Sequence, residues 1–266
     1  MIKMPKPRNY QTEAIIIKKT RLGEADRILT LYTPGLGKIQ AVAKGVRRPR
    51  SKMSGHLELL THSLISLARG KNIDTVTNCR TINSFLPLKS DLELAACALY
   101  VTELVNQFAA DHLENRPFFR LLLETLQRLS QANDSGLALR YFELQLLNVT
   151  GYRPQLQHCV SCRQSLKPAT SFFSPGSGGV ICPECRMKQP LSYPVSTSAL
   201  KVMRRLQNSD FNTTRSLKLP PELSREVEIL LRNYLQYLLE REIKSAVWRD
   251  SLRYRGAGGT TPPLTA

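Results

Sequence analysis

The sequence predicts an α+β chain of several domains, in which an N-terminal five-stranded barrel precedes an all-α domain with an inserted four-cysteine segment. Three observations predict this fold class. Short apolar runs broken by turn residues fill the first 85 residues, helical spacing follows, and two close cysteine pairs interrupt that spacing. A length of 266 residues is enough for two or three modules.

Five segments before residue 86 are predicted to be strands, because they are rich in Ile, Val, Leu and Thr and are separated by Gly and Pro. Five short strands within about 75 residues suit a small closed barrel, and the OB-fold is the common five-stranded barrel that meets single nucleic acid strands. The predicted strands are Ala14–Lys18, Arg27–Tyr32, Lys38–Ala43, Leu57–Ala68 and Thr75–Phe85.

Beyond Pro87 the apolar residues recur with helical spacing. Gly151 is well placed to end the third helix, and Pro154 prevents its continuation. Pro220 and Pro221 open a last helix that we expect to run unbroken to about Tyr254 with a buried stripe. The predicted helices are 92–105, 118–129, 137–149, 198–207 and 220–254.

The cysteines at 152–190 form two C-x2-C pairs, namely Cys159 with Cys162 and Cys182 with Cys185. Two such pairs on adjoining turns can hold one Zn²⁺ with four thiolates and leave no position for water, so we predict one structural zinc ion. Two disulfides or four idle thiols are the alternatives, which a reducing cytosol disfavours. His158 is a less favoured substitute ligand, and the two remaining cysteines, Cys79 and Cys97, are predicted to be buried small hydrophobes.

The net charge of +17 makes a polyanion such as nucleic acid the leading expectation for a partner. Residues 1–83 hold 16 Lys and Arg against 5 Asp and Glu, whereas residues 84–157 hold 6 against 8 and residues 158–266 hold 16 against 8. The charge therefore sits at the two ends of the chain. Solubility is the alternative role for such charge.

Five cations surround a glycine and a proline directly after the third predicted strand, and we predict that they form a basic loop that follows a phosphate backbone. Such a loop reads charge and not sequence. Its members are Lys44, Arg47, Arg48, Arg50 and Lys52.

Other residues of the barrel carry weaker expectations. Arg21, Arg27 and Lys38 are candidates for extending the same groove. The aromatic residues Tyr10, Tyr32 and Phe85 are interpreted as barrel core in preference to base-stacking platforms, so phosphate contacts should dominate binding.

An enzyme is not expected, and no catalytic residue is assigned. The acids of the first module are scattered, the four histidines show no i, i+4 metal pair, and no G-x-x-x-x-G-K-[ST] phosphate loop is present. A membrane partner is not expected either, because no apolar run approaches the ~18 residues of a span and the first residues lack a signal-peptide core. We therefore expect a cytoplasmic, nucleoid-associated protein.

Several motifs resemble the RecO family in residues, order and spacing over roughly residues 10 to 250. Two of these motifs are Gly23-Glu24-Ala25-Asp26-Arg27 and the run Ala43-Lys44-Gly45-Val46-Arg47-Arg48. Further matches are Thr12 to Ile16, Gly37-Lys38-Ile39, Phe142-Glu143-Leu144, Gly151-Tyr152-Arg153-Pro154, the cysteine pairs and Gly178-Gly179.

The resemblance implies an OB-fold, a helical domain with a zinc site, no catalytic residues, and recombinational repair through the RecF pathway. It implies binding of single- and double-stranded DNA, annealing of complementary strands, and cooperation with RecR so that RecA replaces single-strand-binding protein. It also implies that the five cations of the basic loop contact DNA. Some members lack the zinc cysteines, whereas this sequence keeps all four.

Two rivals stay open at this point. A zinc-ribbon OB-fold factor that binds RNA or the ribosome fits the composition equally well, and preference for RNA over DNA would reveal it. An adaptor that docks acidic protein tails on Arg241, Lys244 and Arg249 is the second rival.

The predicted domain order follows from these assignments. Residues 1–84 form the basic OB-fold domain and residues 158–190 the zinc-binding insertion. The helical domain occupies residues 85–157 and 191–254, and residues 255–266, which are mostly Gly, Thr and Pro, form a disordered tail.

Overall fold

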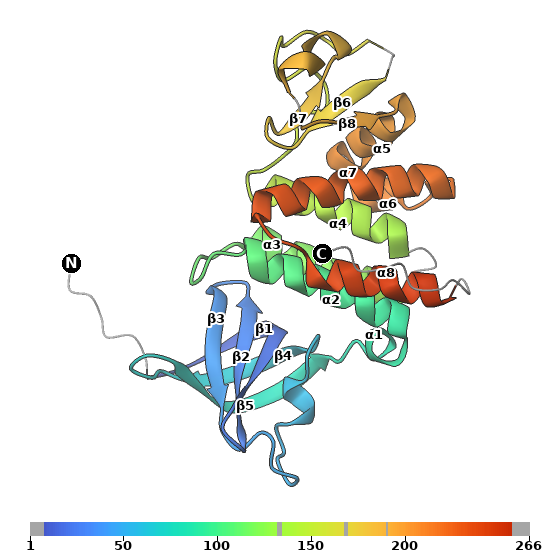
Figure 1. Ribbon diagram of the computed structural model, residues 1–266. Coiled ribbons are helices and arrows are strands. Elements are labelled where there is room, and N and C mark those ends of the chain that lie inside the picture. Colours follow the sequence, from blue (N-terminus) through green and yellow to red (C-terminus); the bar gives the residue numbers. More distant parts are fainter. Residues whose placement is uncertain (1–7, 132–134, 168–169, 190, 257–266) are drawn as a thin grey trace, which may run out of the picture. The chain divides into compact units, whose positions relative to one another are not determined.

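The computed structural model describes residues 8–131, 135–167, 170–189 and 191–256 (Figure 1). The chain divides into two compact units, of which the first contains residues 1–131 and 245–266 and the second residues 132–244. Most of the predicted tail, residues 257–266, lies outside the described part. The finer division into functional segments stays a prediction.

The first unit opens with a closed five-stranded barrel in the order β1-β2-β3-β5-β4, which confirms the predicted barrel (Figure 1). Neighbouring strands are antiparallel except for β3 and β5, which pair in parallel through Ala41 and Val42. The strands are β1 (Asn9–Leu22), β2 (Asp26–Thr33), β3 (Gly37–Ala43), β4 (His62–Ala68) and β5 (Asp74–Asn83).

The barrel core is built by alternation along the strands. Leu29 and Leu31 of β2 are fully buried and lie in the same core cluster as Ile65 and Leu67 of β4. A bulge in β1 between Ile16 and Lys18 interrupts the alternation, so that three consecutive isoleucines, Ile15 to Ile17, are all buried. The outer face of β1 is thereby apolar where α2 packs against it.

The predicted fourth strand, Leu57–Ala68, is wrong at its start. Gly55–Leu57 is a 3₁₀ turn (η1), and β4 begins only at His62. Leu57 is nevertheless 1% exposed, because η1 inserts it into the barrel core. In the sequence, an apolar residue that fills the end of a barrel cannot be distinguished from the first residue of the following strand.

Four helices complete the first unit, and α8 runs beside α2 in Figure 1. The carboxylate of Asp91 caps α2 by accepting from the Leu94 N–H at 2.8 Å. At the start of α8 the Ser245 N–H donates to Glu103 of α2, and the Arg249 guanidinium lies 4.9 Å from the Tyr100 ring centre. The helices are α1 (Pro87–Ser90), α2 (Leu92–Phe108), α3 (Arg116–Gln131) and α8 (Lys244–Gly256).

The turn between β2 and β3 joins the barrel to these helices. The Lys38 ammonium donates to the Asn106 carbonyl at 2.9 Å and pairs with Asp111, while the His112 N–H donates to the Lys38 carbonyl. Tyr32 of β2 packs edge-on against Phe118 of α3 with ring centres 5.2 Å apart. These contacts hold one end of the barrel against α2 and α3.

The second unit combines four helices with a three-stranded sheet in the order β7-β6-β8. Gly151, with φ +85°, ends α4 as predicted, and the Tyr152 N–H donates back to Leu147. The elements are α4 (Ser135–Val149), β6 (Ser171–Ser174), β7 (Gly179–Ile181), η2 (Pro183–Lys188), β8 (Tyr193–Val195), α5 (Thr197–Asn208), α6 (Phe211–Thr214) and α7 (Pro221–Leu239).

The last predicted helix is wrong in one respect, since residues 220–254 form two helices. Helix α7 ends at Leu239, and Glu240 adopts the left-handed conformation with φ 52° before α8 begins at Lys244. Ile243 is buried in the connection between the two helices. A glycine or asparagine usually occupies this conformation at the end of a helix, and glutamate rarely does. The sequence therefore carries no signal for the break at Glu240.

Candidate nucleic-acid interface and metal centre

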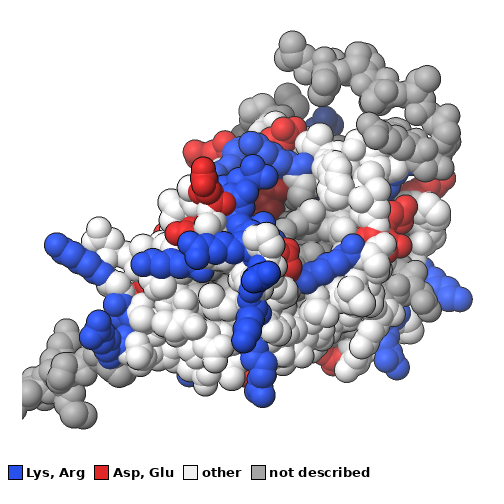
Figure 2. Space-filling view, turned by 90° about the horizontal axis from the view of Figure 1, so that it is seen from below, with Lys and Arg blue, Asp and Glu red and all other residues white. Residues whose placement is uncertain are grey.

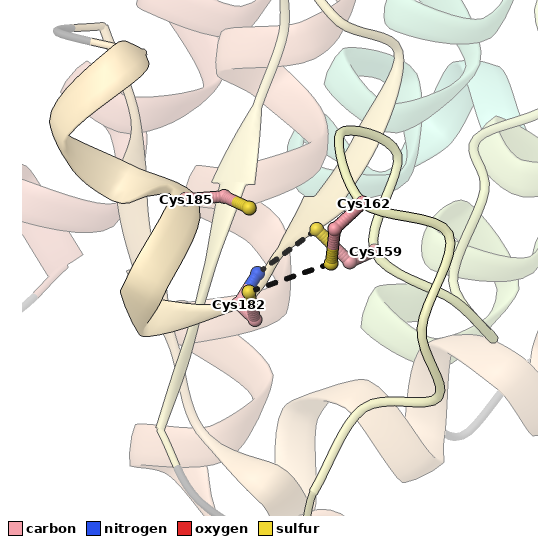
Figure 3. A group of neighbouring side chains, drawn as sticks. All are labelled: Cys159, Cys162, Cys182 and Cys185. Atoms are coloured by element: carbon pink, nitrogen blue, oxygen red, sulfur yellow. Dashed lines mark hydrogen bonds between the residues drawn. The ribbon is translucent and has the colours of Figure 1, made fainter.

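The four predicted cysteine ligands come together in the second unit (Figure 3). Cys159 and Cys162 lie in the loop after α4, Cys182 follows β7, and Cys185 lies on η2. The loop returns on itself at Arg163, whose N–H donates to the Cys159 carbonyl at 2.8 Å. The Val160 N–H donates to Val180, which ties this loop to β7.

The geometry fits a tetrahedral metal ion with four sulfur ligands. All four sulfur atoms lie within 4.8 Å of one another, and those of Cys162 and Cys182 are 3.9 Å apart. A Zn²⁺ ion with bonds of about 2.3 Å would need sulfur atoms about 3.8 Å apart. The cluster can therefore hold a metal ion as the cysteine spacing predicts.

The thiols of the cluster differ in how readily they lose a proton. Burial raises the pKa of the Cys159 thiol, but the backbone N–H groups of Cys162 and Cys182 outweigh this effect and lower it to about 6. The neighbouring Cys182 side chain raises the pKa of Cys185 to about 12. A metal ion that binds all four as thiolates must displace protons from this cluster.

The other candidates do not join the metal group. Cys79 and Cys97 are buried in the barrel and in α2, which confirms their interpretation as small hydrophobes. His158 is exposed, and the metal group found among the described residues contains only the four cysteines.

The basic loop leaves the end of β3 as a series of turns, as predicted, and the β1–β2 hairpin holds it in place. The Gly45 N–H donates to the Asp26 carboxylate at 2.7 Å, and the Arg47 N–H donates to the Ala25 carbonyl at 2.9 Å. Gly45 has φ +64°, a conformation that suits glycine. The motifs around Gly23 and Ala43 are thus two halves of one structure.

All five cations of this loop are exposed: Lys44, Arg47, Arg48, Arg50 and Lys52. The Arg47 guanidinium donates to the Gly23 carbonyl at 3.2 Å, which leaves its charge unneutralised. Among the ion pairs between described residues, none involves any of the five. The structure thus brings them together on one solvated loop with their charge available to a polyanion.

Figure 2 is a view from below, onto the end of the barrel from which the basic loop extends in Figure 1. Lys and Arg side chains predominate on this face and project into solvent in several directions, with acidic side chains among them. An open face of this kind suits a flexible polyanion better than it suits a small ligand.

The three candidates for extending the groove have different environments. Arg21 is exposed at the end of β1. Arg27 pairs with Glu58, and Lys38 is only 15% exposed in its contacts with Asp111 and Asn106. Lys38 therefore has a structural role, since it links the barrel to the helices of the first unit.

The aromatic residues are largely structural, but the interpretation as barrel core is wrong for Tyr32, which packs on the outside of the barrel against Phe118 of α3. Tyr32 and Phe85 are each 1% exposed, whereas Tyr10 is half-buried, donates its hydroxyl to Asp74 and lies 4.6 Å from the Arg69 guanidinium. Arg69 belongs to the β4–β5 turn. The sequence carries no signal of a function for this turn beyond its Arg-Gly pair.

The adaptor hypothesis loses one of its three cations. Arg249 is 3% exposed, since α8 buries it against Tyr100, and so it is not available to an acidic tail. Arg241 and Lys244 are exposed.

Comparison with known proteins decides the family. Residues 4–85 match "Recombination protein O N terminal" and residues 89–246 match "Recombination protein O C terminal". The chain belongs to the RecO family. Family membership places it among DNA repair and recombination proteins, and the family resemblance seen in the sequence is confirmed.

Curated relatives agree along nearly the whole chain. The DNA repair protein RecO of Dehalococcoides mccartyi is 48% identical over 249 residues, covering 94% of this chain and 98% of the relative. That of Roseiflexus sp. is 42% identical, covering 92% and 87%, and that of Desulforudis audaxviator is 36% identical, covering 90% and 95%. Among the described helices, none is both long and apolar enough to cross a membrane.

Proposed function

We propose that the chain is a non-enzymatic recombination mediator that binds single- and double-stranded DNA through the basic loop and anneals complementary strands. The observation that carries the proposal is the set of five exposed cations between β3 and η1, without carboxylate partners among the described residues. Membership of a DNA repair family supports DNA as the polyanion.

Electrostatics accounts for annealing without a chemical step. Two complementary strands repel each other through their phosphates, and a cationic loop that neutralises phosphates of both lowers this repulsion so that bases can pair. Each phosphate contact releases counterions, so binding should weaken steeply with salt. Because the loop contacts only backbone charge, it should not distinguish sequences.

Replacement of Arg47, Arg48 and Arg50 by Ala together tests the loop. The variant should bind single-stranded DNA more weakly and show a salt slope smaller by up to about 2, at about 0.7 per lost contact. Replacement of the exposed cations Lys201, Arg215 and Lys218 by Ala is a control with the same loss of charge. An unaltered slope in the loop variant, or an equal loss in the control, would contradict the proposed interface.

Two incubations test the class of function. Labelled complementary strands with Mg²⁺ should anneal without cleavage, whereas cleavage would mean a nuclease. Competition between single-stranded DNA and RNA of equal length should show no preference for RNA, because nothing in a phosphate-reading loop selects a 2′-hydroxyl.

We further propose that the protein acts with RecR to help RecA replace single-strand-binding protein on gapped DNA. Its support is family membership alone. RecA filament formation on DNA coated with single-strand-binding protein should accelerate when this protein and RecR are added together, and not when either is added alone. Equal rates in all mixtures would remove this part of the proposal.

For the cysteine cluster we propose one structural Zn²⁺ per chain, held by Cys159, Cys162, Cys182 and Cys185. Four thiolates fill the coordination shell and leave no open position for substrate. Elemental analysis of the purified protein should give one zinc per chain. Iron or a sub-stoichiometric metal content would contradict the assignment.

A further inference from the structure

A second group of cations lies near the basic loop, but its side chains point toward the inside of the barrel. Lys19 of β1 lies opposite Leu29 of β2 in the strand register, and Leu29 is a core residue. Residues that face each other across antiparallel strands point to the same side of the sheet, so the Lys19 side chain extends inward. Arg27, two residues before Leu29, shares that inner side.

One carboxylate serves both cations. The Glu58 carboxylate accepts from the Lys19 ammonium through Oε2, and its Oε1 lies 3.4 Å from Nη1 of Arg27. Glu58 directly follows Leu57, the residue of η1 that fills the barrel end. The side chains of Lys19, Arg27 and Glu58 are 18%, 28% and 45% exposed, so the group remains open to solvent.

Lys89 adds a third cation from α1. Its ammonium donates to the Thr61 hydroxyl at 2.7 Å, which is a neutral partner. Burial lowers the pKa of Lys89, Glu58 opposes that shift and Lys19 reinforces it, so both charges act on this ammonium. Two cations thus pair with Glu58, and Lys89 is joined to the same residue through Thr61, whose N–H donates to the Glu58 carbonyl at 3.2 Å.

The strand register places a fourth cation beside them. Arg21 lies directly opposite Arg27, which puts two guanidinium groups on the same side of the β1–β2 pair. Like charges that face each other across strands are destabilising, and Glu58 offsets only part of the charge because it already pairs with Lys19 and Arg27. Guanidinium and ammonium groups form strong charge-assisted hydrogen bonds to phosphate, so a phosphate group could neutralise the remaining charge.

We propose that Lys19, Arg27 and Lys89, gathered around Glu58, form a binding site for a phosphate group, with Arg21 at its rim. The site differs from the basic loop because its cations belong to strands and a helix and are held in place by Glu58 and Thr61. Within the proposed function it would fix one phosphate of a DNA strand while the loop follows the others. That part rests on the proposed function, whereas binding of inorganic phosphate does not.

Variants of opposite sign test the site by calorimetric titration with inorganic phosphate. Lys89→Gln removes a cation and should weaken phosphate binding at least 3-fold. Glu58→Gln removes the competing carboxylate and should strengthen it by a similar factor. Lys218→Gln, at an exposed cation in the second unit, should change nothing.

A purely structural role for the cluster predicts a different result, since both variants would lower the thermal midpoint and neither would alter phosphate binding. That outcome overturns the site. Conversely, a shift in phosphate affinity with a midpoint equal to that of the unmodified protein supports it, because binding has then changed without loss of folding.

Titration with DNA separates the sources of the phosphate. Lys89→Gln should reduce the salt slope for single-stranded DNA by about 0.7, one contact, whether or not the strand carries a 5′-phosphate. A reduction only with the 5′-phosphorylated strand would assign the site to strand ends. If the loop variant loses DNA binding but Lys89→Gln changes neither titration, this inference fails while the proposed function stands.

Discussion

Arg140 and Glu143 form a buried ion pair in the second unit, with 2% and 1% of their side chains exposed. Its guanidinium donates to Glu143 at 2.6 Å and lies 3.3 Å from Glu228 of α7, which in turn pairs with Arg232. Removal of one charge from such a network is costly, because the opposite charge stays in the interior. The network therefore stabilises the packing of α4 against α7 only when all of its charges are present.

Arg140→Met should destabilise the second unit by about 3–5 kcal/mol, because Glu143 and Glu228 lose their shared cation in the interior. Urea denaturation followed by circular dichroism measures the change. Arg116→Met is a control, since the Arg116–Glu114 pair is exposed and should contribute less than about 1 kcal/mol. Equal effects of the two substitutions would contradict this account of the buried network.

His62 gives the first unit a pH dependence. Burial lowers the pKa of His62, and the Glu13 carboxylate, 3.4 Å from Nε2, opposes this shift only in part. The folded state therefore binds a proton less readily than the unfolded state does. The stability that neutral His62 contributes is present above about pH 6.5 and is lost as the pH falls below it.

His62→Gln should accordingly lose less stability than the unmodified protein between pH 7.5 and 5.5. The difference has an upper limit of about 1.4 kcal/mol, which corresponds to one pH unit below the ordinary histidine pKa. Urea denaturation at both pH values provides the comparison. His158→Gln, at an exposed position, should keep the original pH dependence, and the same profile in His62→Gln would show that another group is responsible.

At the scale of elements, Gly37 determines how the barrel meets its helices. It has φ +63°, and a Cβ atom there would lie 2.0 Å from the Leu113 carbonyl oxygen in the α2–α3 connection. Gly37→Ala should cost more than about 2 kcal/mol, because the left-handed backbone alone costs about 1–2 kcal/mol and the clash adds to it. Thermal denaturation would measure the loss.

Gly35 provides the matched substitution in the same turn. A Cβ atom at this position would have no other atom within 4 Å, and Gly35 has no positive φ. Gly35→Ala should therefore change stability by less than about 1 kcal/mol in either direction. Similar midpoints for the two alanine variants would mean that the turn does not dock as closely as the distances indicate.

Elements with a local signature were predictable from the sequence, and those fixed by tertiary contacts were not. The C-x2-C pairs and the basic loop are contiguous, so spacing alone indicated them. The break at Glu240 and the plug at Leu57 depend on what surrounds them. The cluster around Glu58 was equally invisible, because it requires the register of β1 against β2.

At the scale of the molecule, both units are basic. The first unit holds 23 Lys and Arg against 12 Asp and Glu, and the second holds 15 against 9, which gives net charges of +11 and +6. The proposed DNA contacts and the cysteine cluster belong to different units. Because each is anchored by hydrogen bonds within its own unit, the two sites should respond independently to substitution.

Cys182→Ser should abolish stoichiometric zinc and lower the thermal midpoint of the second unit, while Cys79→Ala should keep the metal because that thiol is buried in the barrel. In the same Cys182→Ser protein the salt slope for single-stranded DNA should stay within about 0.5 of the original value, since no loop cation is lost. Conversely, the Arg47, Arg48 and Arg50 variant should keep one zinc per chain. Circular dichroism should show whether the zinc-free chain is still folded. If it is folded and its salt slope falls by more than about 1, the metal-bearing unit has DNA contacts of its own. The two sites would then not be independent.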